Sequence, residues 1–465
     1  MALTPEEQFE KLTKQGINCY AYEYDFVTTI AEFIESPGTK VAGRISMLCE
    51  TDMTVELSDA TDTVRVALEN NRHNAKLLPL VTVGDIVGIE GSWSDDKKVF
   101  IGSKITMLTK SREETGKLTA RDKQLKLKHV LYIDDRQQAK VLFTRSELIR
   151  QLRDYLHKEK FQEIDTPLLH PFQGDSTSRP MFVQPLAYEN LSFALASSPE
   201  LYLKKMLVAG FNKVFTVNKV FRDEIIDATH LMEFTSVEYY MVYVDYNYMM
   251  TFTEKMLKQL TYGITGKKQI PFNGVLLDFE KPWKKISIHN TLKKRFKQDL
   301  FALPYDKLLE TAKSIDITYD KPTSPGNIII DVFEKLYLDT LIQPTFIYDF
   351  PKDASVMCYD ITMAKAKRDS DDTILERFEL YMGGMELANC YSELNDPEEQ
   401  RAAFDLFLKQ RNKELSMDAT FYHALRTGMP PASGVGFGID RLLMILSDSS
   451  DILDTVPFST YHESL

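Results

Sequence analysis

The sequence predicts an α+β protein in which a small all-β barrel precedes a larger domain built on an antiparallel sheet. Residues 40–110 contain five short β-type segments with one helical segment among them, which predicts the barrel. Residues 221–240 have a polar, acidic middle between β-rich flanks, which predicts two antiparallel strands joined by a loop. Residues 433–446 combine a glycine-rich strand with an apolar helix. These last two segments predict the sheet of the larger domain.

The β-type segments of the barrel are, in order, VAGRISML, MTVELSD, VRVALE, DIVGIEGSW and KVFIGSKITML. The helical segment NAKLLPLV stands between the third and the fourth, and this order predicts an OB-fold over residues 39–110. Such barrels bind single-stranded nucleic acid through stacked aromatic side chains and a basic groove. The nearest candidates for such contacts, each better explained as a structural residue, are Trp93, Phe100 and Arg44. Residues 1–38 are expected to form a short helix, which ends at Gly16, and a connector.

The rest of the chain divides into a linker and the larger domain. Residues 111–135 are polar and charged, which is typical of a linker. The larger domain is expected over residues 136–465, where strands and helices alternate without an internal repeat. Its first helix carries an apolar stripe, typical of a core-facing helix, made of Leu148, Ile149, Leu152, Tyr155 and Leu156. Residues 304–326 are expected to form a short helix and a proline-bearing loop, for which the sequence indicates no role.

Composition limits the class of protein. With 465 residues and 43% hydrophobic residues, the chain can bury the cores of two or three domains. A net charge of −12 argues against nucleic-acid binding over the whole surface, so any RNA contact must be local. The cysteines have no CxxC spacing and are expected to be reduced thiols: Cys19, Cys49, Cys358 and Cys390. No apolar run approaches the roughly 20 residues that span a bilayer, and the acidic start MALTPEEQFEKL lacks the features of a signal peptide. We therefore expect a cytoplasmic protein without a membrane segment.

The second strand of the hairpin in residues 221–240 predicts a binding surface. Side chains alternate along a strand, so one face carries an aromatic ring, a hydroxyl, a carboxylate and a phenol, from Phe234, Ser236, Glu238 and Tyr240. This mixture is unusual for a core face and natural for the floor of a pocket. On this segment alone, an exposed hairpin of mixed polarity is an equally good interpretation. Arg222 is expected at the end of the first strand.

The segment SGVGFGIDRLLMIL predicts a site for an anionic ligand. Gly434, Gly436 and Gly438 alternate along its strand, and without Cβ atoms they allow a ligand to lie flat against it. Arg441 falls in the first turn of the helix that follows, where it can reach a phosphate that the positive helix end also attracts.

Residues 376–397 predict a third cluster, which is acidic. The glycine pair at 383–384 stands between β-prone flanks and predicts a tight hairpin turn. In that register Glu379 lies diagonal to Glu386, about 7–8 Å apart at the Cβ atoms, so the two carboxylates could share Mg²⁺ ions that bridge ATP phosphates. Three further polar residues alternate with the opposite parity: Asn389, Tyr391 and Glu393. For all five to line one pocket, we predict a β-bulge between Glu386 and Asn389.

These segments resemble a known family. FRDE…EFTSVE is similar to the second motif, and GFGIDR to the third motif, of class II aminoacyl-tRNA synthetases. FQEIDTPLL, with Pro167, resembles the first motif, and the three occur in the family's order. With the N-terminal barrel, the resemblance covers essentially the whole chain. Within the class, the chain is most similar to lysyl-tRNA synthetases, in the subclass that they share with the aspartyl and asparaginyl enzymes.

The resemblance implies an activity and partners. The enzyme would activate L-lysine with ATP and Mg²⁺ to lysyl-adenylate, and transfer the lysyl group to the 3′ end of tRNA(Lys). The barrel over residues 39–110 would bind the anticodon, and residues 136–465 would form the class II catalytic domain. The helix and strand before Pro167 would build a homodimer interface.

The resemblance also implies roles for individual residues. Arg222 and Arg441 would be catalytic, with Arg222 contacting both the α-phosphate of ATP and the carboxylate of the amino acid. ATP would be bound by Arg222, Glu224, His230, Phe234, Glu379, Gly438 and Arg441. Metal would be bound by Glu379 and Glu386. Lysine would be bound by Glu200, Arg222, Glu238, Tyr240, Asn389, Tyr391 and Glu393. Two carboxylates at the distal end of the pocket would select a cationic side chain and repel aspartate.

Three alternatives remain. SSPE, KKMLVAG, ELYMGGMELAN and TGMPPASGV are similar to the ligase that attaches lysine or β-lysine to elongation factor P, although that paralogue lacks the barrel. FALASSPELY is similar to the aspartyl branch, which keeps an aspartyl- or asparaginyl-tRNA synthetase in view. A non-catalytic, synthetase-like scaffold is the third alternative, but such proteins lose the phosphate-binding arginines, and Arg222 and Arg441 are both present.

Overall fold

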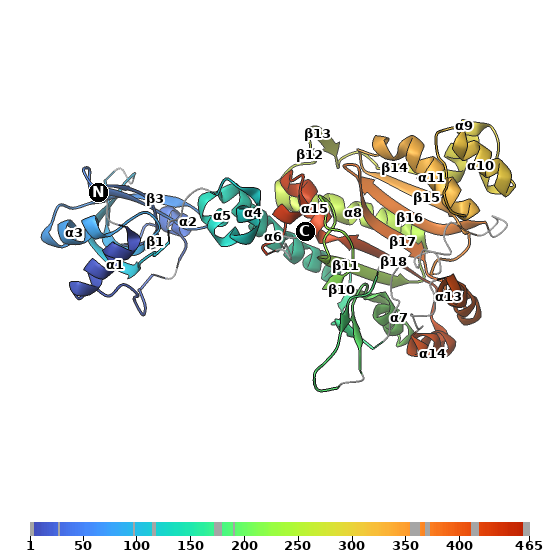
Figure 1. Cartoon of the computed structure of the whole chain (residues 1–465), viewed down its shortest axis with the longest axis horizontal. Coiled ribbons are helices and arrows are strands. Elements are labelled where there is room, and N and C mark those ends of the chain that lie inside the picture. Colours follow the sequence, from blue (N-terminus) through green and yellow to red (C-terminus); the bar gives the residue numbers. More distant parts are fainter. Residues whose placement is uncertain are drawn as a thin grey trace. The chain divides into compact units, whose positions relative to one another are not determined.

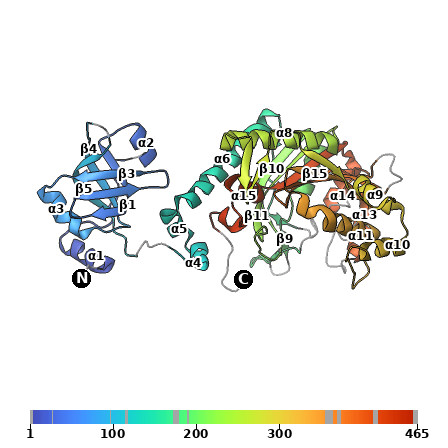
Figure 2. The same ribbon diagram turned by 90° about the horizontal axis from the view of Figure 1, so that it is seen from above.

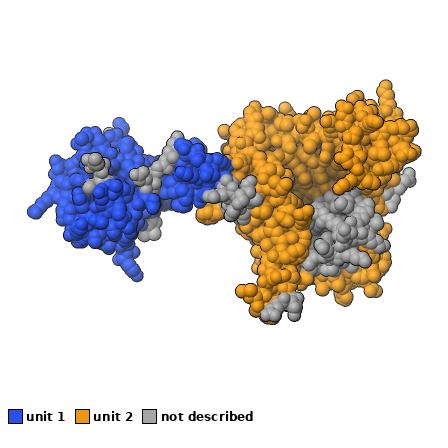
Figure 3. All heavy atoms as spheres, viewed as in Figure 1, with its two compact units in different colours: residues 1–140 blue, residues 141–465 orange. Residues whose placement is uncertain are grey.

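The chain divides into two compact units, residues 1–140 and 141–465 (Figure 3). The computed structural model describes residues 4–26, 28–95, 98–113, 118–171, 179–188, 191–353, 363–367, 373–410 and 418–458. Within these ranges, no helix has both the length and the apolar composition needed to cross a membrane. Three cysteines are free thiols, namely Cys19, Cys49 and Cys390, and Cys358 lies outside the described residues.

Unit 1 contains a closed β-barrel (Figure 1). The order of its strands is β1-β2-β3-β5-β4. Its strands are β1 (Lys40–Cys49), β2 (Thr54–Ser58), β3 (Thr63–Leu68), β4 (Ile86–Trp93) and β5 (Phe100–Thr109). β3 and β5 pair in parallel and close the barrel, while its other strand pairs are antiparallel. The helices are α1 (Pro5–Lys14), α2 (Ile30–Glu35) and α3 (Arg72–Leu77), and α3 lies between β3 and β4. The predicted barrel with a helix after its third strand is confirmed.

The aromatic residues of the barrel build its core. Phe100 is fully buried, and its ring centre lies 5.2 Å from that of Phe33 and 5.7 Å from that of Trp93. Arg44 donates a hydrogen bond of 2.6 Å from Nη1 to the backbone oxygen of Gly84. The structural interpretation of Trp93, Phe100 and Arg44 therefore holds.

A buried ion pair ties the end of β5 to the rest of unit 1. The ammonium of Lys110 lies 2.9 Å from a carboxylate oxygen of Asp85 and donates to Oε1 of Gln8 on α1 at 2.8 Å. Both charged side chains are fully buried. The segment expected as a linker, residues 111–135, carries α4 (Arg121–Lys126) and α5 (Lys128–Asp134) among its described residues.

We expect Lys110→Met to destabilise the barrel by about 3–5 kcal/mol, because the substitution leaves the buried Asp85 carboxylate without its cation. The two tryptophans of the chain report on the units separately, since Trp93 lies in the barrel and Trp283 in unit 2. Urea unfolding followed by Trp93 fluorescence in a Trp283→Phe background gives the measurement. Lys104→Met is the matched control, because the ion pair of Lys104 with Glu90 is exposed. Equal midpoints for the two variants would contradict the prediction.

Unit 2 is organised around an eight-stranded sheet with the order β14-β15-β16-β17-β18-β11-β10-β6. The strands from β15 to β10 pair antiparallel, which confirms the predicted antiparallel sheet, whereas the edge strands β14 and β6 pair in parallel with their neighbours. The strands are β6 (Gln162–Glu163), β10 (Lys213–Phe221), β11 (Glu233–Val242), β14 (Lys284–Ser287), β15 (Thr345–Pro351), β16 (Ile374–Met382), β17 (Met385–Ser392) and β18 (Ala432–Gly438). Smaller sheets contain β7 (Leu169–His170), β8 (Phe182–Val183), β9 (Phe193–Leu195), β12 (Gln269–Phe272) and β13 (Val275–Asp278).

Helices cover one face of this sheet and flank its ends. Figure 2 shows α8 (Tyr246–Thr265) along the sheet, where it contacts β16, β17 and β18. Three helices form a separate apolar cluster beside β15: α9 (Ile288–Phe296), α10 (Tyr305–Lys313) and α11 (Pro325–Tyr337). The other α-helices among the described residues of this part of the chain are α6 (Arg136–Lys158), α7 (Glu200–Val208), α13 (Pro397–Gln410), α14 (Ala419–Gly428) and α15 (Ile439–Ser447). α10 confirms the short helix expected within residues 304–326.

The apolar stripe of α6 faces the interior of unit 2. Leu148, Leu152 and Leu156 are fully buried, and the ring of Tyr155 lies 5.8 Å from that of Phe252 on α8. The prediction of a core-facing helix is confirmed.

Candidate active site

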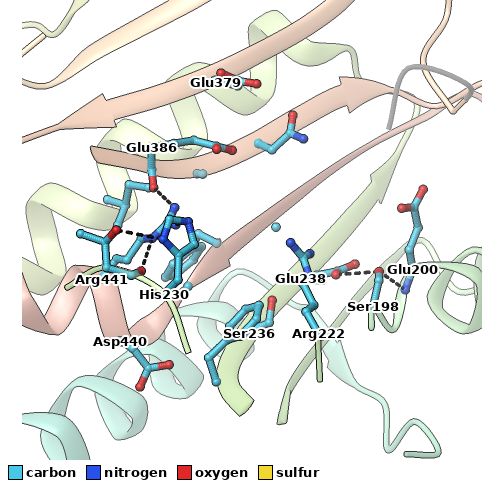
Figure 4. Close-up of a pocket in the computed structure, with 18 of the residues that line it drawn as sticks. Ser198, Glu200, Arg222, His230, Ser236, Glu238, Glu379, Glu386, Asp440 and Arg441 are labelled. Carbon is cyan, nitrogen blue, oxygen red and sulfur yellow. Dashed lines mark hydrogen bonds between the residues drawn. The ribbon is translucent and has the colours of Figure 1, made fainter. Parts of the chain in front are cut away.

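The side chains singled out by the sequence gather in one cavity of about 410 Å³ in unit 2 (Figure 4). This volume suits a small-molecule site. The cavity wall includes every predicted site residue except Glu393: Glu200, Arg222, Glu224, His230, Phe234, Glu238, Tyr240, Glu379, Glu386, Asn389, Tyr391, Gly438 and Arg441.

Strand β11 supplies the floor of the cavity, as its alternation predicts. Phe234, Ser236, Glu238 and Tyr240 all line the cavity. Tyr239, of the opposite parity, instead bonds to Thr253 of α8 across a distance of 2.6 Å. The cavity and α8 therefore lie on opposite faces of the sheet.

The glycines that alternate along β18 do not all leave space for a ligand. β18 pairs antiparallel with β11, and Gly434, Gly436 and Gly438 lie opposite the cavity residues of β11. A Cβ atom at Gly434 would lie 2.1 Å from a ring carbon of Tyr240 and 2.7 Å from a carboxylate oxygen of Glu393, whereas one at Gly438 would meet nothing within 4 Å. The expectation that all three glycines make room for a ligand is therefore wrong for Gly434, which makes room for the protein's own side chains.

Arg441, in the first turn of α15, is held by the loop that precedes β11 and by the start of β17. Its Nη1 donates to the backbone oxygen of Glu386 at 2.6 Å, its Nε to that of Thr229 at 3.2 Å, and its Nη2 to Nε2 of His230 at 2.9 Å. Because Nε2 accepts, the proton of His230 is on Nδ1, which donates to Asp227 at 2.9 Å. Partial burial opposes ionisation of Asp227, but hydrogen bonds from Thr229 and His230 lower its pKa to about 2. His230 thus orients the guanidinium.

Arg222 follows β10 and lines the cavity. Its guanidinium carbon lies 5.3 Å from the centre of the Phe234 ring. Its Nε is buried and has no hydrogen-bond partner in the part of the chain that the structure describes. Glu224, two residues further along, is half-buried in the same loop. A carboxylate or phosphate entering the cavity would satisfy the unpartnered Nε of Arg222.

The hairpin of β16 and β17 has the predicted turn and the predicted bulge. Gly383 and Gly384 form the turn, with φ values of 63° and 79°, which only glycine adopts readily. Leu387 is an extra residue in β17, because the residues on either side of it pair with adjacent residues of β16. The bulge expected between Glu386 and Asn389 is confirmed. It restores a common face, so that Glu386 and Asn389 both line the cavity.

The acidic end of this hairpin contains a cation that the sequence analysis missed. Arg377 donates from Nη2 to Oε1 of Glu379 at 2.7 Å and from Nε to the side-chain oxygen of Asn389 at 3.1 Å. The hydroxyl of Tyr381 donates to the other oxygen of Glu379 at 3.1 Å. Burial raises the pKa of Glu379 to about 8, with Arg377 opposing the shift and the carboxylate of Glu386 adding to it.

These two carboxylates fit a divalent cation. Mg²⁺ prefers carboxylate, phosphate and water oxygens, and a dication between Glu379 and Glu386 would remove their repulsion. Within the described ranges, no group of three or more His, Cys, Asp or Glu side chains could hold a metal. Such an ion would therefore take further ligands from a bound phosphate or from water.

The opposite end of the cavity presents two more carboxylates, each held by hydroxyl groups. Glu238 accepts from Ser198 and from Tyr240, both at 3.0 Å, and Glu200 accepts from Tyr391 at 2.8 Å. Burial raises the pKa of Glu238 to about 8, and the nearby Glu200 carboxylate adds to this shift. A ligand that brings positive charge would stabilise the ionised form of Glu238.

Glu393 lies behind the cavity wall rather than on it. Its side chain is completely buried and forms an ion pair with Lys204 of α7. Lys204 also donates to Glu200 at 2.5 Å. Lys204 therefore joins Glu393 to Glu200, but the expectation that Glu393 lines the pocket is not borne out, because its side chain is not part of the cavity wall.

A second buried ion pair braces the helix that carries Arg441. Asp440 accepts from Nη1 of Arg145 on α6 at 2.6 Å and from the backbone N–H of Thr235 at 2.7 Å. Nη2 of Arg145 donates to the hydroxyl of Thr235 at 2.7 Å. The first turn of α15 is thereby fixed to α6 and to the start of β11.

Sequence reasoning missed four residues of this site: Ser198, Lys204, Arg377 and Asp440. A signal existed for two of them. Arg377 shares the strand parity of Glu379, and Lys204 stands four residues after Glu200 on a helix, where side chains are neighbours. The carboxylate that Ser198 contacts and the partners of Asp440 lie on other elements, so no local pattern indicates these pairings.

Comparison with known proteins places this architecture in a family. Residues 121–462 match the family model described as tRNA synthetases class II (D, K and N). The chain belongs to this family. The match covers β11, the hairpin of β16 and β17, and β18 with α15, which together surround the cavity of this class II synthetase.

Several curated relatives of this synthetase cover most of both chains. A protein named lysine–tRNA ligase 2 from Methanosarcina acetivorans is 33% identical, over 96% of this chain and 91% of the relative. Lysine–tRNA ligase from Carboxydothermus hydrogenoformans is 32% identical, over 97% of this chain and 96% of the relative. Lysine–tRNA ligase from Coxiella burnetii is 36% identical, over 81% of this chain and 76% of the relative.

Proposed function

We propose that this synthetase is a lysine–tRNA ligase, which activates L-lysine with ATP and transfers it to tRNA(Lys). The observation that carries the proposal is the charge of the cavity. Glu200 and Glu238 lie at one end, and Arg222, whose buried Nε has no partner among the described residues, lines the same cavity. This arrangement suits an amino acid with a cationic side chain and an anionic carboxylate. The names of the relatives support the same substrate.

The first step needs positioning and charge neutralisation rather than a base. A carboxylate oxygen of lysine attacks the α-phosphorus of ATP, the new P–O bond forms, and the bond to the β-phosphate oxygen breaks to release pyrophosphate. The nucleophile is already an anion, so no proton has to be removed. Arg222 contacts the lysine carboxylate and the α-phosphate, and neutralises the charge that develops on the phosphoryl oxygens.

The other end of the cavity holds ATP. Phe234 stacks on the adenine ring and Arg441, oriented by His230, covers its opposite face. Glu224 contacts the nucleotide, and Gly438 leaves open space above β18. Glu379 and Glu386 would hold Mg²⁺, which would neutralise phosphate charge when it is bound.

Selection of lysine depends on the carboxylates. Glu200 binds the α-ammonium and Glu238, with Tyr240, Asn389 and Tyr391 around it, faces the distal ammonium. Aspartate would instead add a third carboxylate to a dry site, at a cost of several kcal/mol.

Transfer to tRNA completes the function. Residues 39–110 bind the anticodon of tRNA(Lys), residues 111–135 connect the barrel to the catalytic domain of residues 136–465, and residues 1–38 precede the barrel. The family resemblance further supports a homodimer that acts in the cytoplasm. Because the apolar stripe of α6 packs inside unit 2, a contact of α6 with a second copy would use its other faces, together with the strand before Pro167.

Lysine-dependent ATP–pyrophosphate exchange tests the proposal. With Mg²⁺ present, we expect exchange with lysine and none above background with aspartate or asparagine, because those side chains cannot neutralise Glu238. β-Lysine is included, since a protein-modifying ligase could prefer it. Exchange driven by aspartate or asparagine would remove Glu238 from the side-chain subsite, and no exchange with any amino acid would favour a scaffold.

The acceptor is decided by a second assay on the full chain. Radiolabelled lysine is supplied with ATP and either total tRNA or purified elongation factor P. We expect label on tRNA alone, because the chain carries a barrel in addition to the catalytic unit. Label on the protein instead would identify the ligase of the elongation factor type.

A further inference from the structure

Lys204 is a fully buried lysine that has no role in the proposed mechanism. It lies on the cavity side of α7 and is among the largest side chains with no exposed surface. Burying an ammonium is costly unless opposite charges surround it. Its position behind an amino-acid pocket therefore calls for an explanation.

The surroundings of Lys204 are the carboxylates of the pocket. Its Nζ donates to Oε1 of Glu200 at 2.5 Å and forms an ion pair with Glu393. The same nitrogen lies 5.4 Å from the centre of the Tyr391 ring, whose hydroxyl donates to the second oxygen of Glu200 at 2.8 Å. Burial alone would lower the pKa of Lys204, but Glu200 and Glu393 outweigh it and raise the pKa, so the ammonium stays charged.

The ammonium of Lys204 sets the net charge of the amino-acid end of the site. The amino-acid end of the site contains three carboxylates, from Glu200, Glu238 and Glu393, and two cations, from Lys204 and Arg222. Burial raises the pKa of Glu238 and of Glu393 to about 8, so a bound cation favours their ionised forms. In that fully ionised state the balance of the five groups is −1. A lysine zwitterion with a charged side chain adds +1 and makes the site neutral, whereas a neutral amino acid leaves it at −1 and aspartate brings it to −2. Without Lys204 the site would be at −1 even with lysine bound.

We propose that Lys204 is a positioning and specificity-determining residue, which fixes Glu200 and Glu393 through one shared ammonium and sets the pocket charge that a single lysine neutralises. This inference rests on lysine being the substrate. Lys204 is not part of the cavity wall, and acts through Glu200, which lines the cavity, and through Glu393.

Removal of the ammonium should affect lysine selectively. In Lys204→Met, two carboxylates face each other in a dry interior, one of them takes up a proton, and Glu200 loses the bond that orients it. We expect the KM for lysine in pyrophosphate exchange to rise at least about tenfold, with the KM for ATP within about threefold of its original value. A structural defect alone would lower kcat or raise both constants.

Lys205→Met is the matched control. Lys205 is the next residue on α7, and it pairs with Asp418 at a partly exposed position outside the cavity wall. We expect this variant to keep both KM values. If Lys204→Met fails to fold, Lys204→Gln takes its place, because an amide retains a donor for a carboxylate but removes the charge.

A double-mutant cycle with Glu393→Gln completes the test. If Lys204 and Glu393 act as one unit, the fold increase in the KM for lysine of Lys204→Met/Glu393→Gln is well below the product of the fold increases of the two single variants. Three results would each overturn the inference: a fold increase in the double variant that equals that product, an unchanged KM for lysine in Lys204→Met, or an equal rise in the KM for ATP. If the unsubstituted chain shows no exchange with lysine, the proposed function fails, and the inference fails with it.

Discussion

Arg222→Ala is expected to lower lysine-dependent ATP–pyrophosphate exchange by about 10³-fold, because it removes the donors aimed at the transferring phosphoryl group. Arg222 lies over Phe234 and has a buried Nε without a partner in the described part of the chain. The Arg222→Ala substitution therefore removes no hydrogen bond donated by Nε. The fold should survive, as monitored by Trp283 fluorescence during thermal unfolding.

Two further variants separate the role of Arg222 from a general loss of charge. Arg222→Lys keeps the positive charge but not the planar, bidentate group, so its activity should lie between those of the alanine variant and the unsubstituted chain. Arg295→Ala removes an exposed arginine of α9 in the same unit and should leave exchange unchanged. Robust exchange by Arg222→Ala would show that another group neutralises the α-phosphate.

The KM for lysine is expected to fall on the order of tenfold as pH rises from 6.5 to 8.5. Burial raises the pKa of Glu238 to about 8, so this carboxyl is largely neutral at the lower pH and ionised at the higher. Only the ionised form attracts the side-chain ammonium of lysine, which remains protonated over this range because its pKa is about 10.4. Affinity should therefore increase with pH. The KM is measured by pyrophosphate exchange at saturating ATP.

Glu238→Gln provides the control for this pH profile. The amide cannot ionise, so we expect the KM for lysine to be raised about 100-fold and to lose its dependence on pH, while the KM for ATP changes little. Burial raises the pKa of a second nearby carboxyl, that of Glu393, to about 8 as well. A pH dependence that persists in Glu238→Gln would assign the titration to Glu393 instead.

Alternation along strands was sufficient to predict two walls of the site. The parity of β11 put Phe234 and Glu238 on one face, and the parity conflict within β17 predicted a bulge. Both are properties of a single strand, in which successive side chains point to opposite faces. The barrel was predictable for the same reason, since its strands and α3 follow one another along the chain.

The charge pairing of the site was not predictable in this way. Lys204 meets Glu393, and Arg145 meets Asp440, across nearly two hundred residues or more of sequence. The space at Gly434 belongs to Tyr240 and not to a ligand, because neighbouring strands decide what fills it.

The sequence by itself determined the kinds of chemistry in this protein: arginines for phosphates, paired carboxylates for cations, and the barrel that precedes them. Only the tertiary structure decided which carboxylates remain open to a ligand and which are already neutralised. The physical reason is that a buried carboxylate keeps its charge only beside a counter-ion. For Glu393 that partner comes from a different element, so its state is a property of the fold and not of its own segment.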